Sequence, residues 1–183
     1  MRTPVFMLIV CQSLTGAQQI KIEHLAGGNM VSVTNIKGSD STKIYRAGKP
    51  SQQGGRLLLT HHRRDIVPTI PQDAHVVAPR EEEPLFSKTE DYWNAMSQKR
   101  FHYYTQQSTK VLVKPVKVKQ WVSEGDIVES AGIKFRVVAT PGFTRGAISY
   151  FATIEGKRCA FTGDLIYGDG KIFDLYSFQD AIP

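Results

Sequence analysis

The chain has few cysteines and no long apolar run. Its 183 residues include two cysteines, Cys11 and Cys159, so a scaffold held together by several disulfides is excluded. If a leader that contains Cys11 is removed, the remaining chain can form no internal disulfide. The apolar run at residues 5–10 is much shorter than the roughly 20 residues that a transmembrane helix needs. The sequence therefore predicts no transmembrane segment.

The sequence also lacks an aromatic stacking set beside its basic residues. The formal net charge of +6 and the pI near 9.3 would suit an acidic partner. Much of the excess comes from four lysines that alternate with valines, namely Lys110, Lys114, Lys117 and Lys119. This alternation is typical of a strand with one solvated lysine face. A basic nucleic-acid-binding module, whose signature would be steep salt dependence, is therefore the least favoured functional hypothesis.

The first seventeen residues have the pattern of a secretory signal peptide. Arg2 precedes the apolar run, and the small residues Gly16 and Ala17 follow it as a cleavage site. Residues 1–17 are therefore predicted to be a leader, with a secreted or periplasmic location for residues 18–183. The alternative is a buried first strand in a cytoplasmic chain.

A hydrophobic content of 41% with 22% charged residues is typical of one globular domain.

Short alternating apolar runs predict a chain made mostly of strands. The predicted strands cover residues 31–34, 43–45, 56–59, 75–78, 111–118, 127–129, 133–139, 147–154 and 157–162. One helix is predicted, because Ser87 and Glu90 form a capping box that places Trp93 and Met96 on one face. This order of elements favours a mixed or antiparallel sheet-on-sheet core that helices cover.

Three polar segments follow or join the predicted strands. They read Thr-His-His-Arg-Arg-Asp-Ile at residues 60–66, Thr-Pro-Gly-Phe-Thr at residues 140–144 and Thr-Gly-Asp at residues 162–164. Together they resemble the motifs T-H-x-H-x-D-H, T-P-G-H-T and T-G-D of the metallo-β-lactamase superfamily. The resemblance covers residues 31–177. It implies an α/β (α+β) fold, the αββα metallo-β-lactamase-like sandwich, with its C-terminal part incomplete and residues 18–183 as a partial domain.

The resemblance also implies a zinc centre of one or two ions, in which the aspartate of the third motif bridges two metal positions. The residues that match ligand positions are His61, Asp65 and Asp164. The residues that stand where the family has histidines are Arg63, Ile66 and Phe143. Asp65 is also the candidate catalytic residue. His62 and Thr144 are candidates to hold the ligand residues in position without binding the metal, and His62 could instead face solvent.

The ligand count argues against an intact zinc centre. A zinc ion takes three or four N, O or S ligands, whereas each metal position here keeps Asp164 and one other residue, His61 or Asp65. Arg63 is effectively always protonated, so it cannot ligate a metal and it repels a nearby divalent cation. These observations suggest the hypothesis that Arg63 bridges Asp65 and Asp164 in place of the metal.

The sequence therefore supports a hydrolase-like protein with impaired activity. In the family a metal-bound hydroxide is the nucleophile, and the substrates here would be small esters, thioesters or lactams. The alternative is a non-catalytic pseudoenzyme that binds a ligand or a protein through the same fold. Metal content separates the two hypotheses, because a fold alone does not establish an activity.

Overall fold

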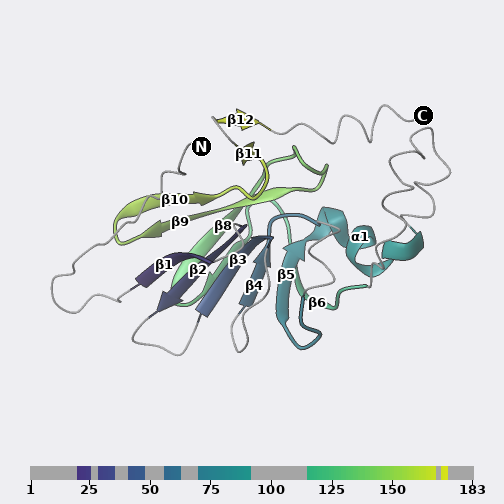
Figure 1. Ribbon diagram of the computed structural model, residues 1–183, viewed down its shortest axis with the longest axis horizontal. Coiled ribbons are helices and arrows are strands. Elements are labelled where there is room, and N and C mark those ends of the chain that lie inside the picture. The colour runs from purple at the N-terminus through teal and green to yellow at the C-terminus, as the bar shows by residue number, and fades with distance from the viewer. Residues whose placement is uncertain are drawn as a thin grey trace, which may run out of the picture.

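The computed structural model of the chain describes residues 20–25, 29–35, 41–47, 56–62, 70–91, 115–167 and 170–172. Most of these residues form two sheets (Figure 1). The first sheet has six strands, in the order β1-β2-β3-β4-β5-β6. They are β1 (Ile20–Leu25), β2 (Asn29–Asn35), β3 (Ser41–Ala47), β4 (Arg56–Leu59), β5 (His75–Pro79) and β6 (Val118–Val122).

The second sheet has four antiparallel strands in the order β10-β9-β8-β7. They are β7 (Ile127–Ser130), β8 (Ile133–Ala139), β9 (Ile148–Ile154) and β10 (Lys157–Phe161). A separate antiparallel ladder pairs β11 (Ile166–Tyr167) with β12 (Lys171–Ile172). After β5 the chain forms the 3-10 helix η2 (Arg80–Glu82) and the helix α1 (Glu83–Ser87).

The strand directions bring two loops of the first sheet to one edge. Strands β1 to β3 are antiparallel, whereas β3 to β6 run parallel. Because parallel strands end at the same edge, the loop that begins at Thr60 lies beside η2, which begins at Arg80. In open α/β sheets ligand sites lie at this edge. The first motif is therefore placed where functional loops gather.

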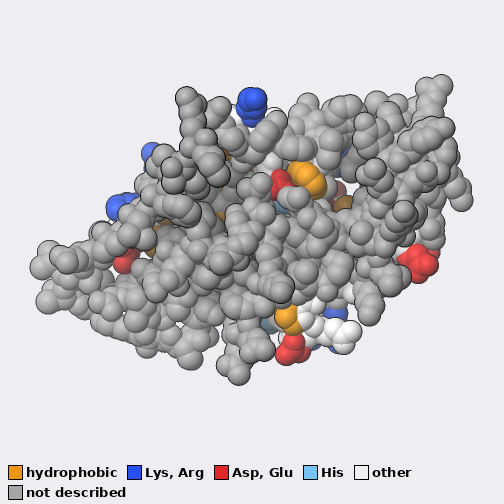
Figure 2. Space-filling model, in the orientation of Figure 1, with side chains coloured by type: hydrophobic (Ala, Val, Ile, Leu, Met, Phe, Trp, Pro, Cys, Tyr) orange, Lys and Arg blue, Asp and Glu red, His pale blue; other side chains and the backbone are white. Residues whose placement is uncertain are grey.

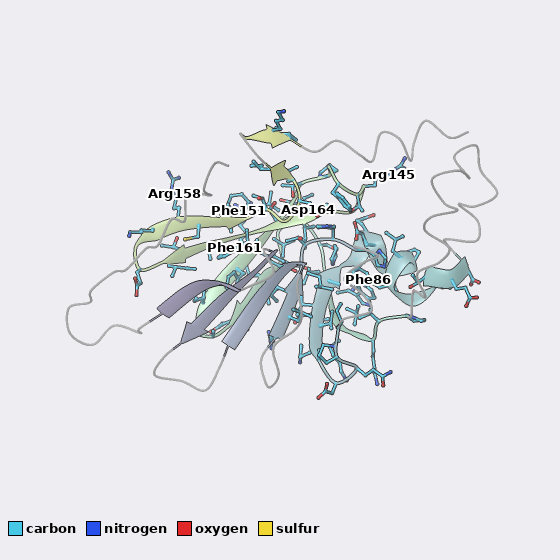
Figure 3. The ribbon with its side chains drawn as sticks, viewed as in Figure 1. Phe86, Arg145, Phe151, Arg158, Phe161 and Asp164 are labelled. Carbon is cyan, nitrogen blue, oxygen red and sulfur yellow. The ribbon has the colours of Figure 1, made fainter. Side chains whose placement is uncertain are left out.

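A hydrophobic core fills the space between the two sheets. Its buried members include Leu58, Val77 and Val122 from the first sheet and Phe135, Val137 and Tyr150 from the second. The other face of the first sheet buries Leu57, Leu59, Val76 and Ala78 against Phe86 of α1. Strands β4 and β5 are thus apolar on both faces, as buried parallel strands are. The layers run helix, sheet, sheet, with Phe86 and Phe161 in separate layers (Figure 3).

Strand β6 corrects one sequence prediction. The predicted strand at residues 111–118 lies partly outside the described residues, and residues 115–117 are not a strand. Pro115 has no N–H to donate to a ladder, and the N–H of Val116 donates instead to the carbonyl of Phe86 at 2.9 Å. The strand begins at Val118. Lys117 and Lys119 are exposed, which confirms the solvated lysine face at these two positions.

The helical segment corrects a second prediction. Ser87 was predicted to be an N-cap, but it is the last residue of α1, and its hydroxyl donates to the carbonyl of Glu83 at 2.7 Å. A further helical stretch begins at Thr89, and Trp93 and Met96 lie outside the described residues. The sequence analysis did not predict α1, which has Pro84 in its first turn, a position where proline is favoured. Among the described helices, none has the length and apolarity to cross a membrane.

Two hydrogen bonds join the sheets at the end of β4. The hydroxyl of Tyr150 on β9 donates to the carbonyl of Leu59 at 3.0 Å, and the amide of Ile148 donates to the carbonyl of Thr60 at 2.8 Å. Tyr150 is fully buried, and burial raises the pKa of its phenol, so the hydroxyl remains a donor. These bonds set the position of the first motif relative to the second sheet.

We predict that Tyr150→Phe lowers the free energy of unfolding by about 1–3 kcal/mol, because the buried carbonyl of Leu59 loses a donor while the ring stays packed. Denaturant unfolding of both chains measures this difference. Thr153→Val, which removes an exposed hydroxyl from the same strand, is the control and should change stability little. A Tyr150→Phe variant as stable as the parent would contradict the proposed role of this bond.

Candidate functional site

The first and third motifs meet at a buried pair of side chains. His61 follows β4, and Asp164 lies in the turn between β10 and β11. The Nε2 atom of His61 is 3.3 Å from the Oδ2 atom of Asp164, and the two residues are 6% and 4% exposed. Figure 3 shows Asp164 close to β11, above the ends of the first sheet's strands. The structure therefore brings together two predicted site residues that are about a hundred positions apart in sequence.

The other nitrogen of the His61 ring is held by its neighbour. Nδ1 of His61 is 2.9 Å from Oγ1 of Thr60, which fixes the orientation of the ring. Gly163 packs directly on this hydrogen bond with φ of 58°, and a Cβ atom there would lie 2.3 Å from the Thr60 hydroxyl. Glycine is thus required for two reasons, the left-handed backbone and the lack of space. The glycine of the third motif keeps Asp164 close to His61.

Phe143 of the second motif packs against the same histidine. Its ring centroid is 4.8 Å from that of His61, with an interplanar angle of 50°. The resemblance puts a histidine ligand at this position, and here an aromatic ring without a nitrogen lies there. The second motif therefore contacts the first through an apolar surface at this position.

His62 and Thr144 share a partner that the sequence did not reveal. The backbone N–H of His62 donates to one carboxylate oxygen of Glu82, and the hydroxyl of Thr144 donates to the other. The His62 ring lies 5.0 Å from that of Phe86, edge to face, and is buried, so the prediction that it could face solvent is wrong. Glu82 lies within three consecutive glutamates, and nothing in that run distinguished the buried one.

Glu82 is a buried carboxyl group with an altered pKa. Burial is the main cause, and it raises the pKa of Glu82 to about 7, although the hydrogen bonds from Thr144 and His62 oppose the rise. No positive charge is among the causes of the shift. The group therefore changes protonation near neutral pH, at the junction of two motif loops.

The described residues do not make up a zinc site by themselves. A structural or catalytic zinc ion needs at least three protein ligands. Within the described ranges, His61 and Asp164 are two such groups, and no set of three His, Cys, Asp or Glu side chains could hold a metal. Arg63, Asp65 and Ile66 lie outside the described residues. The predicted bridge from Arg63 to Asp65 and Asp164 therefore stays a hypothesis.

Comparison with curated proteins gives short matches. No family model matches the chain. Hydroxyacylglutathione hydrolases from Pseudomonas putida strains W619 and KT2440 are each 36% identical to it over 55 residues, which is 29% of this chain and 21% of the relative. The match thus spans about a fifth of the length of the curated relatives.

Comparison with solved structures gives broad matches at low identity. The B3 metallo-β-lactamase BLEG-1 has a TM-score of 0.60 and 16% identity, over 86% of this chain and 80% of that one. A metallo-β-lactamase family protein from Thermus thermophilus has a TM-score of 0.59 and 17% identity, over 84% and 61%. A Cronobacter sakazakii metallo-β-lactamase described by a HARLDQ motif has a TM-score of 0.51 and 17% identity, over 78% and 59%. These likenesses confirm the predicted fold.

We predict that Gly163→Ala destabilises the chain more than Gly156→Ala does. Both glycines have positive φ, so each substitution carries the left-handed cost of about 1–2 kcal/mol. A Cβ atom at Gly156 meets nothing within 4 Å, whereas one at Gly163 clashes with Thr60. Overpacking should add about 1–3 kcal/mol at Gly163, which thermal or denaturant unfolding measures. Equal losses at the two positions would mean that the third motif is not packed against Thr60.

The raised pKa of Glu82 predicts a pH-dependent stability. Between pH 4.5 and about 7 the unfolded chain releases the Glu82 proton while the folded chain retains it, so stability falls as the pH rises through this window. At about 1.4 kcal/mol per pKa unit, the fall amounts to roughly 3 kcal/mol, and it levels off above the folded-state pKa. Glu82→Gln has no proton to release there. If Glu82 is the cause, the unfolding free energies of the two chains should differ least near pH 4.5 and diverge as the pH rises towards 7, because only the parent loses stability, and a difference that stays constant across this range would contradict it.

Proposed function

Because the chain has the metallo-β-lactamase fold, we propose that it is a hydrolase by descent whose zinc-dependent activity is impaired. Its ancestral substrates would be small esters, thioesters or lactams. The observation that supports this proposal is the contact of Phe143 with His61, at 4.8 Å between ring centroids, in a second motif that otherwise matches the family. The scaffold of the site persists while a nitrogen donor has been replaced.

The chemistry of the site explains why the substitution matters. A bound zinc ion would lower the pKa of its water to about 7 and so provide hydroxide at neutral pH. The residues for such an ion would be His61, Asp65 and Asp164, with Asp65 as the catalytic candidate. His61 and Asp164 already contact each other at 3.3 Å, and Phe143 brings no lone pair. Impaired metal binding follows from this donor set.

A second candidate function is hydrolysis by a centre that tolerates arginine in the first motif. The HARLDQ motif of the Cronobacter sakazakii protein, aligned on its first histidine, has arginine and aspartate where this chain has Arg63 and Asp65. That protein is named a metallo-β-lactamase, so arginine at this position occurs within the fold. In this case the Arg63 side chain would point away from the metal, and His61, Asp65 and Asp164 would hold one ion.

Two other readings receive less support. A non-catalytic binding domain would share every contact described above, and metal content decides between it and a hydrolase. A nucleic-acid-binding surface would need a basic patch, and the described charged side chains on the face in Figure 2 lie apart from one another.

The leader at residues 1–17 lies outside the described residues. We propose it on its sequence pattern, and the N-terminal sequence of the exported chain would test it.

The first experiment is metal content by elemental mass spectrometry on the chain loaded with zinc and dialysed. We expect less than one zinc ion per chain and little hydrolysis of thioester or β-lactam probes. The variant Arg63→His, Ile66→His, Phe143→His should bind zinc several orders of magnitude more tightly, since three nitrogen donors return and one positive charge leaves. Phe151→His, which adds a histidine at an exposed site on β9, is the matched control.

Each outcome decides a specific point. One or two zinc ions per parent chain, together with hydrolysis, would overturn the impairment and favour the second candidate. No gain by the triple variant over Phe151→His would mean that the three motifs do not converge on one metal position. Zinc binding by the triple variant alone would support descent from a zinc hydrolase.

A further inference from the structure

Glu82 belongs to none of the three motifs, yet it contacts two of them. It lies at the end of η2, which follows β5, and its side chain is 1% exposed. One carboxylate oxygen accepts the N–H of His62 in the loop after β4. The other accepts the hydroxyl of Thr144 in the loop between β8 and β9. Both hydrogen-bond partners are far from Glu82 in sequence, so the carboxylate links three separate segments.

The linked residues are the immediate neighbours of the two rings that meet in the site. His62 follows His61, and Thr144 follows Phe143. The rings of His61 and Phe143 are 4.8 Å apart. A movement of either loop relative to η2 would therefore change the distance between these rings.

The backbone of the second loop also lies directly against η2. A Cβ atom on Gly146 would be 2.5 Å from Cγ of Glu82 and 2.8 Å from Cβ of Glu81. Gly146 has no positive φ, so its role is to allow this close approach and not to relieve backbone strain. The contact between loop and helix is therefore built in two ways, by the carboxylate and by the missing side chain.

A carboxylate at this position is costly, and its hydrogen bonds offset the cost only in part. Burying an ionisable group without a charged partner is unfavourable, and an apolar side chain would fill the space at lower cost. An apolar side chain could not satisfy the amide of His62, which would then be buried without an acceptor. The chemistry of the position thus selects a side chain that reaches both loops.

We propose that Glu82 is the positioning residue of this site, which holds the loop of His61 in a fixed place against the loop of Phe143. The role does not depend on hydrolysis, and it holds whether the site binds a metal, a ligand or neither. The role requires a side chain with two acceptor oxygens, or an amide that accepts a hydrogen bond from His62 and donates one to Thr144. Glutamine meets this requirement, because its carbonyl can accept from His62 while its NH₂ group donates to Thr144.

The test is a set of NMR spectra of the full metal-free chain, labelled with 15N in the backbone and histidine rings and with 13C in the phenylalanine rings. In Glu82→Ala we expect the His62 amide proton to lose the downfield shift of a carboxylate-bonded donor. The ring signals of His61 and Phe143 should shift with it. Glu82→Gln should restore the ring signals, and Glu81→Ala, which keeps its Cβ on the same helical turn, should leave all of them unchanged.

If Glu82→Ala does not fold, substitutions at two positions of the loop between β8 and β9, Thr144 and Gly146, provide the test. Thr144→Val removes the hydroxyl and should shift the His61 ring signals, whereas Thr144→Ser keeps it and should not. Gly146→Ala should reproduce the shifts of Thr144→Val by pushing the loop from η2. Unmoved His61 and Phe143 signals in folded Glu82→Ala or Thr144→Val, or a failure of glutamine to rescue, would overturn the proposal. No metal is added in these NMR experiments, so their result does not depend on the outcome of the zinc experiment. A failure of the proposed function can therefore be told apart from a failure of this proposal.

Discussion

At the end of β4, buried backbone N–H and C=O groups need hydrogen-bond partners inside the protein. Where the strand stops, its carbonyl and amide groups lose their ladder partners while the chain stays buried. Two elements, β9 and η2, supply the missing partners. The Tyr150 hydroxyl donates to the Leu59 carbonyl, the Ile148 amide donates to the Thr60 carbonyl, and the His62 amide donates to the Glu82 carboxylate. The first motif is therefore held by the second sheet on one side and by η2 on the other. Everything that the site can do follows from this anchoring.

The anchoring does not involve the side chains that meet in the site. None of the three bonds uses the side chain of His61, Phe143 or Asp164. Phe143 packs on His61 while its neighbour Thr144 donates to Glu82. Gly146 and Gly163 allow the loops to pack closely, and this packing does not depend on the other side chains of those loops. The arrangement of the loops thus does not depend on the side chains of the site, and a fold by itself does not establish an activity.

The sequence predicted the strands best where alternation and burial agree. Strands β4 and β8 have the predicted bounds, because apolar residues there alternate or run without interruption between turns. Strand β6 was displaced, because the Val-Lys alternation continued through a proline that cannot pair. His61 and Asp164, which come from the first and third motifs, lie 3.3 Å apart, whereas their role as metal ligands stays a prediction. Glu82 could not be found in this way, because its burial depends on contacts with loops that are distant in the chain.

The ring of His61 beside Asp164 can be hydrogen-bonded in two ways. The hydroxyl of Thr60 can either accept a hydrogen bond from Nδ1–H of His61 or donate one to Nδ1. In the second case Nε2 carries the ring proton, and this nitrogen lies 3.3 Å from Oδ2 of Asp164. In the first case Nε2 can give its lone pair to a cation. The orientation of one hydroxyl thus decides whether Nε2 of His61 presents a proton or a lone pair, and neither arrangement requires the loops to move.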